Sequence, residues 1–411
     1  MNNSEKMLAS LHQQDMEHAR KYFEKALVSD DVDVLFDLAQ YLESIGFFPQ
    51  AKRAYEKVVD EFPQAFLGLS NIASEDGQIE EAFAYLEEIL PESNWYPTSL
   101  VMKADLYQME GLPDVAREKL EEAYQLSEDP LVLFGLAEVD MELGEFTKAI
   151  KEYASLDNRA IYEQTGISTY QRIGFCYAQL GKLEVAIEFL EKALELEYDD
   201  QTTLELAMIL LDQGESQRAL MYFKQLDALS HDYEGYEYGY ALALHAEHQT
   251  KEALAIAKQG LSKNPFETRL ALLASQYAYE LHDQAGAEKY LLEALEDALD
   301  QEDLILRLTN LYLEQERFED VLAFEGEEVD SLFTKWNLAR AYKALEKEEK
   351  ALELYREIAP DLQENPEFLE SYAYLLRELG YLAEAKEQAH RYLTLVPDDS
   401  AMADLYHSLE D

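Results

Sequence analysis

The sequence predicts an all-α fold built from repeated helical hairpins, and three observations support this prediction. Large apolar residues recur at spacings of three and four, which is the period of one face of an α-helix. Small residues recur between them at intervals that mostly lie between 31 and 34 residues. Only 10 prolines and 16 glycines occur in 411 residues, so few residues would interrupt long helices.

The stretch 167–200 shows the repeating unit as two helices joined by a turn at Gly181. Large and small residues alternate on the faces that the two helices would share. These residues are Tyr170, Ile173, Gly174 and Tyr177 in the first helix, and Ala186, Leu190 and Ala193 in the second. Small residues among large ones allow two helix backbones to approach closely. We therefore expect a tightly packed hairpin here.

The small residue Ala186 has a counterpart in every unit. The series is Ala19, Ala51, Ala82, Ala116, Ala149, Ala186, Ala219, Ala253, Ala287, Val321, Ala351 and Ala385. Glycine matches the turn residue Gly181 at Gly46, Gly77, Gly111, Gly144, Gly214 and Gly380. There glycine can take the left-handed conformation that ends a helix. His248 and His282 replace it in two units, which predicts weaker turns at the same spacing.

This pattern of small residues resembles the tetratricopeptide repeat, whose period is about 34 residues. The resemblance covers nearly the whole chain, and the chain is similar to the soluble tetratricopeptide-only proteins of Gram-positive bacteria. It implies a right-handed α-solenoid, a superhelix of about twelve hairpins with a C-terminal capping helix. Met402, Leu405 and Leu409 make the apolar side of that final helix, which would cover the exposed end of the array.

The expected organisation has five segments along the chain. They are an N-terminal capping repeat at 1–31, parts of the array at 32–166, 167–331 and 332–399, and the capping helix at 400–411. Two irregular intervals mark places where the array can bend. The interval from Ala149 to Ala186 is 37 residues, which indicates a short insertion in SLDNRAIYEQTGI. The interval from Val321 to Ala351 is only 30 residues, around FEGEEVDS.

The net charge is −51, from 34 basic and 85 acidic residues spread along the chain. Such a field repels phosphate backbones and anionic headgroups, so we expect neither nucleic-acid nor membrane binding. The acidity also fits a solubilising surface. The first residues, MNNSEKMLASLHQQ, lack the pattern of a signal peptide, and the longest apolar run, 206–211, is too short to cross a bilayer. We expect a cytoplasmic protein.

The sequence carries no motif for catalysis. A phosphate-binding glycine loop, an HExxH motif and an EF-hand loop are all missing. Cys176 is the only cysteine, and its place within a first helix predicts a packed core thiol. His245 and His248 are three residues apart, but no cysteine is near and His248 falls at a turn, so we expect no metal site. We expect no catalytic, cofactor-binding or metal-binding residue.

In the tetratricopeptide family the first helices line a concave groove that binds peptides, and the resemblance implies such a groove here. The predicted groove residues are Phe134, Phe175, Leu204, Met208, Tyr238, Leu242, Leu272, Leu306, Trp336, Arg340, Lys343 and Arg377. The centre of this set, from Phe175 to Leu242, is apolar. Two interpretations stay open: an exposed apolar binding surface, or side chains packed between neighbouring first helices.

Charged residues flank the apolar centre. Acidic groove positions lie N-terminal to it, at Asp33, Glu43, Asp105, Glu138 and Glu142. At the other end, Arg340, Lys343 and Arg377 form a basic trio, for which we favour a role in neutralising the surrounding acid. Some family members grip acidic chaperone tails with a clamp of lysine, arginine and asparagine. Because asparagine is not beside this trio in that order, we expect no such clamp.

These features favour a non-catalytic scaffold or adaptor that binds a peptide or protein segment, apolar at its centre and basic at its flanks. An acidic chaperone or inhibitor that masks a basic client by charge is the alternative. An enzyme with chemistry in the groove is the third candidate. The sequence does not indicate who the partner is or which oligomeric state the protein adopts.

Overall fold

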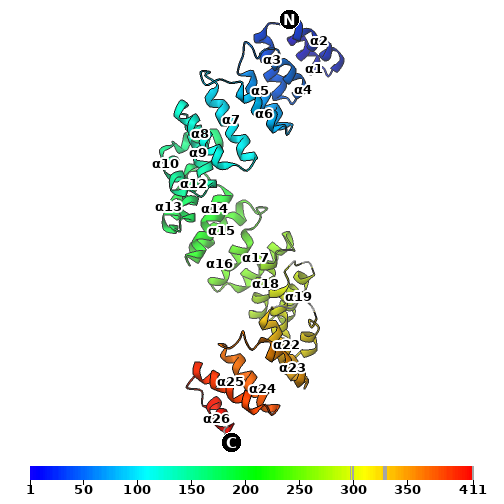
Figure 1. Ribbon diagram of the computed structural model, residues 1–411, viewed down its shortest axis with the longest axis vertical. Coiled ribbons are helices and arrows are strands. Elements are labelled where there is room, and N and C mark those ends of the chain that lie inside the picture. The colour runs from blue at the N-terminus through cyan, green and yellow to red at the C-terminus, as the bar shows by residue number, and fades with distance from the viewer. Residues whose placement is uncertain (297, 299, 327–330, 410–411) are drawn as a thin grey trace. The chain divides into compact units, whose positions relative to one another are not determined.

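The computed structural model describes residues 1–296, 298, 300–326 and 331–409. Within these ranges the chain forms 26 α-helices and no strand, and most of the helices are labelled on the ribbon in Figure 1. They form twelve consecutive pairs, with α11 and α26 outside the pairs. The prediction of an all-α fold of helical hairpins is confirmed.

The chain divides into two compact units, Met1–Ile209 and Leu210–Asp411. The helices wholly within the first are α1 (Asn3–His12), α2 (Met16–Ser29), α3 (Val32–Ser44), α4 (Phe48–Tyr55), α5 (Ala65–Glu75), α6 (Ile79–Glu87), α7 (Tyr96–Met109), α8 (Pro113–Ser127), α9 (Pro130–Glu142), α10 (Phe146–Ser155), α11 (Asn158–Thr165), α12 (Thr169–Gln179) and α13 (Leu183–Leu196). The division falls inside α14 (Asp200–Asp212). The segment boundaries expected at 166 and 331 stay predictions.

The second unit continues with the helices that follow α14. They are α15 (Ser216–Leu229), α16 (Tyr236–Ala246), α17 (Thr250–Lys263), α18 (Thr268–Glu280), α19 (Gln284–Leu295), α20 (Glu302–Glu314), α21 (Phe318–Leu322), α22 (Leu332–Ala344), α23 (Glu348–Ile358), α24 (Pro366–Glu378), α25 (Leu382–Leu395) and α26 (Ser400–Ser408). The short α21 precedes the irregular stretch FEGEEVDS, and the expected bend there falls partly on 327–330, outside the described residues.

The turn between the two helices of each pair holds one residue with a positive φ. Glycine occupies it in seven pairs, with φ between 70° and 83°. Gln14, His248, His282, Glu316 and Glu346 occupy it in the others, with φ between 57° and 63°. In all twelve pairs this residue lies five positions before the small residue of the series. Because the left-handed conformation costs a residue with a side chain about 1–2 kcal/mol, these five turns are strained.

The small residues bring the helices of a pair together. Every member of the series from Ala19 to Ala385 is at most 2% exposed. In the reference hairpin, a Cβ added to Gly174 would lie 3.3 Å from the backbone oxygen of Ala186. The close approach predicted for these helices is confirmed.

The two ends of the chain are covered in different ways. At the N-terminus, Asp30 accepts hydrogen bonds from the backbone nitrogen and the hydroxyl of Ser4, at 2.7 Å and 2.8 Å, so the end of α2 holds the start of α1. At the C-terminus, α26 buries Met402 and Leu405 in the apolar cluster of α22 to α25, and Leu409 packs against it. The predicted capping helix is therefore present.

The insertion between Ala149 and Ala186 forms a helix of its own. Residues Asn158–Thr165 make α11, which is capped by Asp157 at its start and by Gly166 in the left-handed conformation at its end. Ile161 anchors it by packing with Phe134 and Ile173. The carboxamide oxygen of Asn158 accepts a hydrogen bond from the backbone nitrogen of Thr169 at 2.8 Å, which fixes α11 against the start of α12.

None of the helices in the described part of the chain is both long and apolar enough to cross a membrane.

Candidate binding surfaces

The predicted groove residues all lie on first helices of the pairs. Phe134 is on α9, Phe175 on α12, Leu204 and Met208 on α14, Tyr238 and Leu242 on α16, Leu272 on α18, Leu306 on α20, Trp336, Arg340 and Lys343 on α22, and Arg377 on α24. All twelve residues therefore lie on the first helix of a pair, at more than one position along it.

Seven of the apolar residues are half-buried. We call this set the groove stripe: Phe175, Leu204 and Met208 in the first unit, and Tyr238, Leu242, Leu272 and Leu306 in the second. Leu272 also packs against the apolar cluster of α19 and α20. The ring of Tyr238 lies 4.8 Å from the guanidinium of Arg269 on the next first helix. Half-buried side chains keep apolar surface that a ligand can cover.

The other two apolar residues belong to the cores. Phe134 is 7% exposed and packs edge-on against Tyr153 of α10. Trp336 is 8% exposed, and its indole nitrogen donates a hydrogen bond to the hydroxyl of Tyr355 at 3.1 Å. For these two residues the packing interpretation describes the structure, and they offer little surface to a ligand.

Several of the acidic groove positions already have partners in the chain. Glu43 accepts hydrogen bonds from the hydroxyl of Tyr55 at 2.5 Å and from the side chain of Asn71 at 2.8 Å. Glu138 accepts from the hydroxyl of Tyr153 at 2.5 Å and from Nε of Arg172 at 2.8 Å. These carboxylates therefore hold consecutive pairs together.

Two other carboxyls on first helices are desolvated. Burial raises the pKa of Glu205 on α14 to about 7, although the nearby Arg172 opposes this shift. Desolvation also raises the pKa of Asp105 on α7. A carboxylate that has lost water is stabilised when a cation approaches it.

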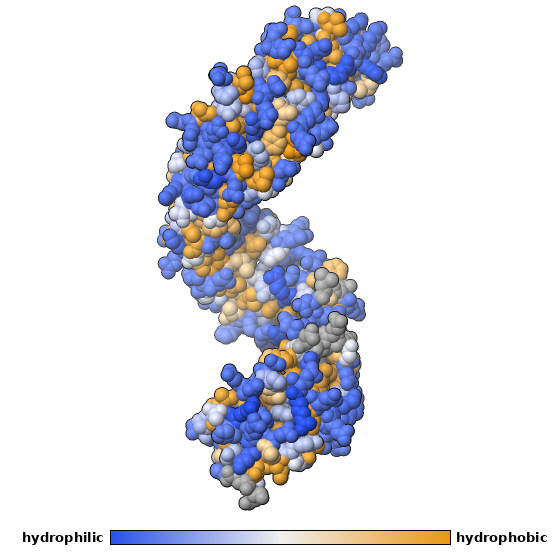
Figure 2. All heavy atoms as spheres, viewed as in Figure 1, coloured by the Kyte–Doolittle hydropathy of each residue, from blue (hydrophilic) through white to orange (hydrophobic). Residues whose placement is uncertain are grey.

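In the view of Figure 2, hydrophilic residues cover most of the visible surface.

Each member of the basic trio has a neighbour within the chain. Lys343 pairs with Glu378 at 3.0 Å. The guanidinium of Arg340 lies 5.9 Å from the ring of Trp336, and that of Arg377 lies 5.2 Å from the ring of Tyr374. The pair with Glu378 fits a role for Lys343 in neutralising acid, and this role of the trio stays a prediction.

The candidate reactive or metal-binding residues, Cys176, His245 and His248, each have a structural place in the fold. Cys176 is fully buried, and burial raises the pKa of its thiol to about 11. The imidazole of His245 pairs with Glu280 at 2.7 Å and stacks on Tyr277, while His248 forms the turn. No group of three or more metal-ligating side chains occurs among the residues that the structure describes.

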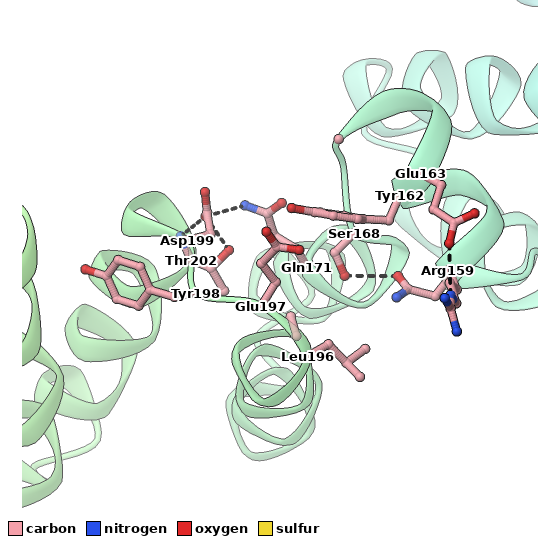
Figure 3. Close-up of a pocket in the computed structure, with 13 residues that line it drawn as sticks. Arg159, Tyr162, Glu163, Ser168, Gln171, Leu196, Glu197, Tyr198, Asp199 and Thr202 are labelled. Atoms are coloured by element: carbon pink, nitrogen blue, oxygen red, sulfur yellow. Dashed lines mark hydrogen bonds and ion pairs between the residues drawn. The ribbon is translucent and has the colours of Figure 1, made fainter.

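A cavity of about 500 Å³ lies beside the inserted helix α11. Figure 3 shows the ring of Tyr162 extending from α11 toward Gln171 of α12 and Glu197 at the end of α13. Leu196 and Asp199 also line this cavity. The 37-residue interval indicated an insertion, but no pattern in the sequence indicated that the inserted helix encloses a cavity with the next pair.

The twelve hairpins, their left-handed turns and their buried small residues define a protein of the tetratricopeptide repeat class. Family models of the tetratricopeptide repeat match residues 36–96 and 167–200. A model of YpiA-like tetratricopeptide repeats matches 108–161, and a model of YpiA-like C-terminal tetratricopeptide repeats matches 333–399. The chain belongs to the tetratricopeptide repeat proteins.

The chain is similar to the TPR repeat-containing protein YpiA of Bacillus subtilis (strain 168), with 29% identity over 340 residues, or 81% of this chain and 79% of that protein. The resemblance to repeat proteins of Gram-positive bacteria is thereby confirmed. Among solved structures, a tetratricopeptide repeat protein from Parabacteroides merdae ATCC 43184 matches with a TM-score of 0.42 and 16% identity, over 60% of this chain and 98% of that one. The APC/C hetero-tetramer Cut9–Hcn1 matches with a TM-score of 0.38 and 15% identity, over 99% of this chain and 95% of that one.

Proposed function

We propose that this protein is a non-catalytic scaffold or adaptor that holds a peptide or protein segment against its first helices. Tetratricopeptide repeats suggest a protein-interaction scaffold, and the groove stripe carries the more specific proposal. Its seven half-buried apolar side chains recur at equivalent positions of successive first helices within each unit. Apolar side chains repeated on successive helices within a unit favour an amphipathic or extended partner segment.

The chemistry of the stripe and of its surroundings describes the segment that would fit. Apolar side chains at the centre of the segment would cover the stripe, and each one buried would contribute about 1.5–3 kcal/mol. Lysine or arginine at its flanks would meet a chain whose net charge is −51. The same charge disfavours a nucleic acid, an anionic membrane or an acidic chaperone tail as the partner. A cytoplasmic location stays a prediction.

A second candidate is an acidic chaperone or inhibitor that masks a basic client by charge. The desolvated carboxyls of Asp105 and Glu205 favour it, because a bound cation would offset the cost of their burial. The two candidates differ in the force that holds the partner. Apolar contacts persist at high salt, whereas attraction between exposed charges is screened.

Capture from a cell lysate at low and at high salt separates the two candidates. The full-length protein would be immobilised, and the recovered proteins would be identified by mass spectrometry. The scaffold proposal expects the same partner at both salt concentrations. Beads that carry an unrelated protein of similar acidity control for unspecific charge. A partner that is lost at high salt, and that the acidic control also recovers, would support charge masking in place of the scaffold.

Kinetics on the recovered partner would then resolve the part played by charge. Long-range attraction increases the rate of encounter more than it strengthens the final complex. Raising salt should therefore slow association markedly and change dissociation little. An association rate indifferent to salt would assign the acidic surface to solubility alone.

A further inference from the structure

The cavity beside α11 is built where the chain departs from its repeat. The inserted helix contributes Arg159, Tyr162 and Glu163 to its lining. The end of α13 and the segment that leads into α14 contribute Leu196, Glu197 and Asp199. All of these residues lie in the first compact unit. None of the seven residues of the groove stripe lines this cavity.

The charged groups around the cavity favour a cation. Three carboxylates, those of Glu163, Glu197 and Asp199, surround it with one guanidinium, that of Arg159. Arg159 Nε donates to Glu163 at 2.9 Å and its side chain is 88% exposed, so this pair is solvated at the rim. The carboxylates of Glu197 and Asp199 are also exposed, and they leave the lining of the cavity with a net negative charge. An anionic ligand would be repelled by both of them.

The carboxylate of Asp199 is held in place by hydrogen bonds. Asp199 accepts hydrogen bonds from the backbone nitrogen and the hydroxyl of Thr202, at 2.7 Å and 2.6 Å. The side chain of Gln171 donates to the same carboxylate at 3.4 Å. The carboxylate of Asp199 is thus oriented by neighbours from two helices, α12 and α14. The neighbouring carboxylate of Glu197 raises the pKa of Tyr162.

Part of the lining is apolar. Leu196 is 63% exposed although it lies at the cavity, and Ala193 and the ring of Tyr162 line the same space. An exposed leucine can be covered by the methylene groups of a long side chain. A tyrosine ring can also contact the face of a planar cation. The cavity therefore combines aliphatic side chains, an aromatic ring and carboxylates, of which that of Asp199 is held by hydrogen bonds.

We propose that this cavity binds an arginine side chain of a partner protein segment. The guanidinium would donate hydrogen bonds to Glu197 and Asp199, in the planar geometry that favours arginine over lysine. The methylene stem of the arginine would lie on Leu196, and the edge or face of its guanidinium would lie against the ring of Tyr162. The proposal rests on the proposed function only in that the arginine belongs to a protein partner. It does not depend on the groove stripe.

Disulfide trapping tests this proposal on the full-length chain. Cys176 is buried and its thiol pKa is raised to about 11, so the natural cysteine should not react. Arg159→Cys places a thiol at the rim of the cavity. Lys57→Cys replaces another exposed basic residue of the same unit, outside the cavity, and serves as the control. The probe is the peptide acetyl-Cys-Gly-Arg-Gly-amide, with twins that carry citrulline or lysine in place of arginine.

Citrulline has the shape of arginine without its charge, so the comparison isolates the guanidinium. Trapping would be measured by intact-protein mass spectrometry under competition with a reducing thiol. At Arg159→Cys, the arginine peptide should be trapped about threefold more than the citrulline peptide, and more than the lysine peptide. At Lys57→Cys the same ratios should be smaller, because only the general attraction of an acidic protein acts there.

Two further variants, both made in the Arg159→Cys chain, assign the effect to the cavity. Glu197→Gln should remove the preference for arginine. Glu195→Gln changes an exposed carboxylate of α13 outside the cavity and should keep it. Equal arginine-to-citrulline ratios at the two cysteine sites, equal trapping of lysine and arginine, or an unchanged preference in Glu197→Gln would each overturn the proposal. None of these measurements involves the groove stripe, so their failure is distinguishable from failure of the scaffold proposal.

Discussion

Gly174 on α12 lies directly against Leu190 on α13. A Cβ added to Gly174 would come within 2.7 Å of Cγ of Leu190, closer than carbon atoms pack. The hairpin at 167–200 therefore has no room for a single methyl group at this position. The same shortage of space explains why a small residue recurs at the position of Ala186 along the chain.

Ala186→Leu should destabilise the protein strongly. Ala186 is fully buried, and inserting extra methyl groups into a packed contact costs about 1–3 kcal/mol. Glu188 is exposed on the same helix, so Glu188→Leu should change the free energy of unfolding by less than about 0.5 kcal/mol. Thermal unfolding of both variants measures this difference. Equal shifts in melting temperature would contradict the orientation of α13.

The strained turns predict a stabilising substitution. Glu346 has φ 57° in the turn between α22 and α23, where glycine would carry no strain. Glu346→Gly should therefore stabilise the protein by about 0.5–1 kcal/mol, after the entropy that glycine gains in the unfolded chain is subtracted. Gly380 has φ 83° in the next hairpin, so the reverse substitution, from glycine to glutamate, can be made there.

Gly380→Glu should destabilise the protein by a similar amount or more. Denaturant unfolding of the two variants tests the pair. Destabilisation by Glu346→Gly would contradict a strained turn at this position.

The repeat made most of the fold predictable from the sequence. The spacing of Ala19 to Ala385 predicts the helix pairs and the buried small residue, and both are present. Three turns were harder to recognise, because Gln14, Glu316 and Glu346 do not have the glycine that signals a left-handed residue. Their position is visible only after the small residue five places later is aligned.

The candidate sites were less predictable because they depend on partners distant in the sequence. Helical periodicity places Phe134 and Leu204 at equivalent positions, but only Phe134 is enclosed in a core. The interval of 37 residues indicated the insertion that became α11. The cavity itself arises from contacts of Tyr162 and Asp199 with the following pair, which no local pattern records.

A buried carboxyl predicts a dependence of stability on pH. Glu152 on α10 has one oxygen, Oε2, that is buried with no hydrogen-bond partner among the described residues. Burial, with the neighbouring Asp140, raises its pKa to about 7, against the opposing effects of Arg117 and Lys148. Between the ordinary pKa of 4.5 and about 7 the folded protein therefore binds more protons at this site than the unfolded chain. Its contribution to stability falls as pH rises through that window.

Glu152→Gln should remove this dependence. The variant should be more stable than the natural protein at pH 8 by about 1 kcal/mol, a value reduced for the partial exposure of the side chain. It should also lose less stability between pH 5 and pH 8. Glu118→Gln, an exposed carboxyl on α8, should follow the natural protein. If the curves of melting temperature against pH are parallel for Glu152→Gln and the natural protein, ionisation of Glu152 does not lower stability, and the prediction is contradicted.

The proposed scaffold function depends on whether the groove stripe is a binding surface or part of the core. Tyr238→Ser combined with Leu272→Ser removes apolar surface from two first helices of the second unit. The matched control combines Met221→Ser with Leu292→Ser, which removes exposed apolar side chains from second helices of the same unit. Partner recovery and melting temperature would be measured for both double variants.

The scaffold proposal predicts that the stripe variant recovers much less partner than the control while the two melting temperatures stay close. If the stripe belongs to the core, each truncation would cost about 2–5 kcal/mol. A large fall in melting temperature with partner recovery unchanged would contradict the central claim that the groove stripe binds the partner.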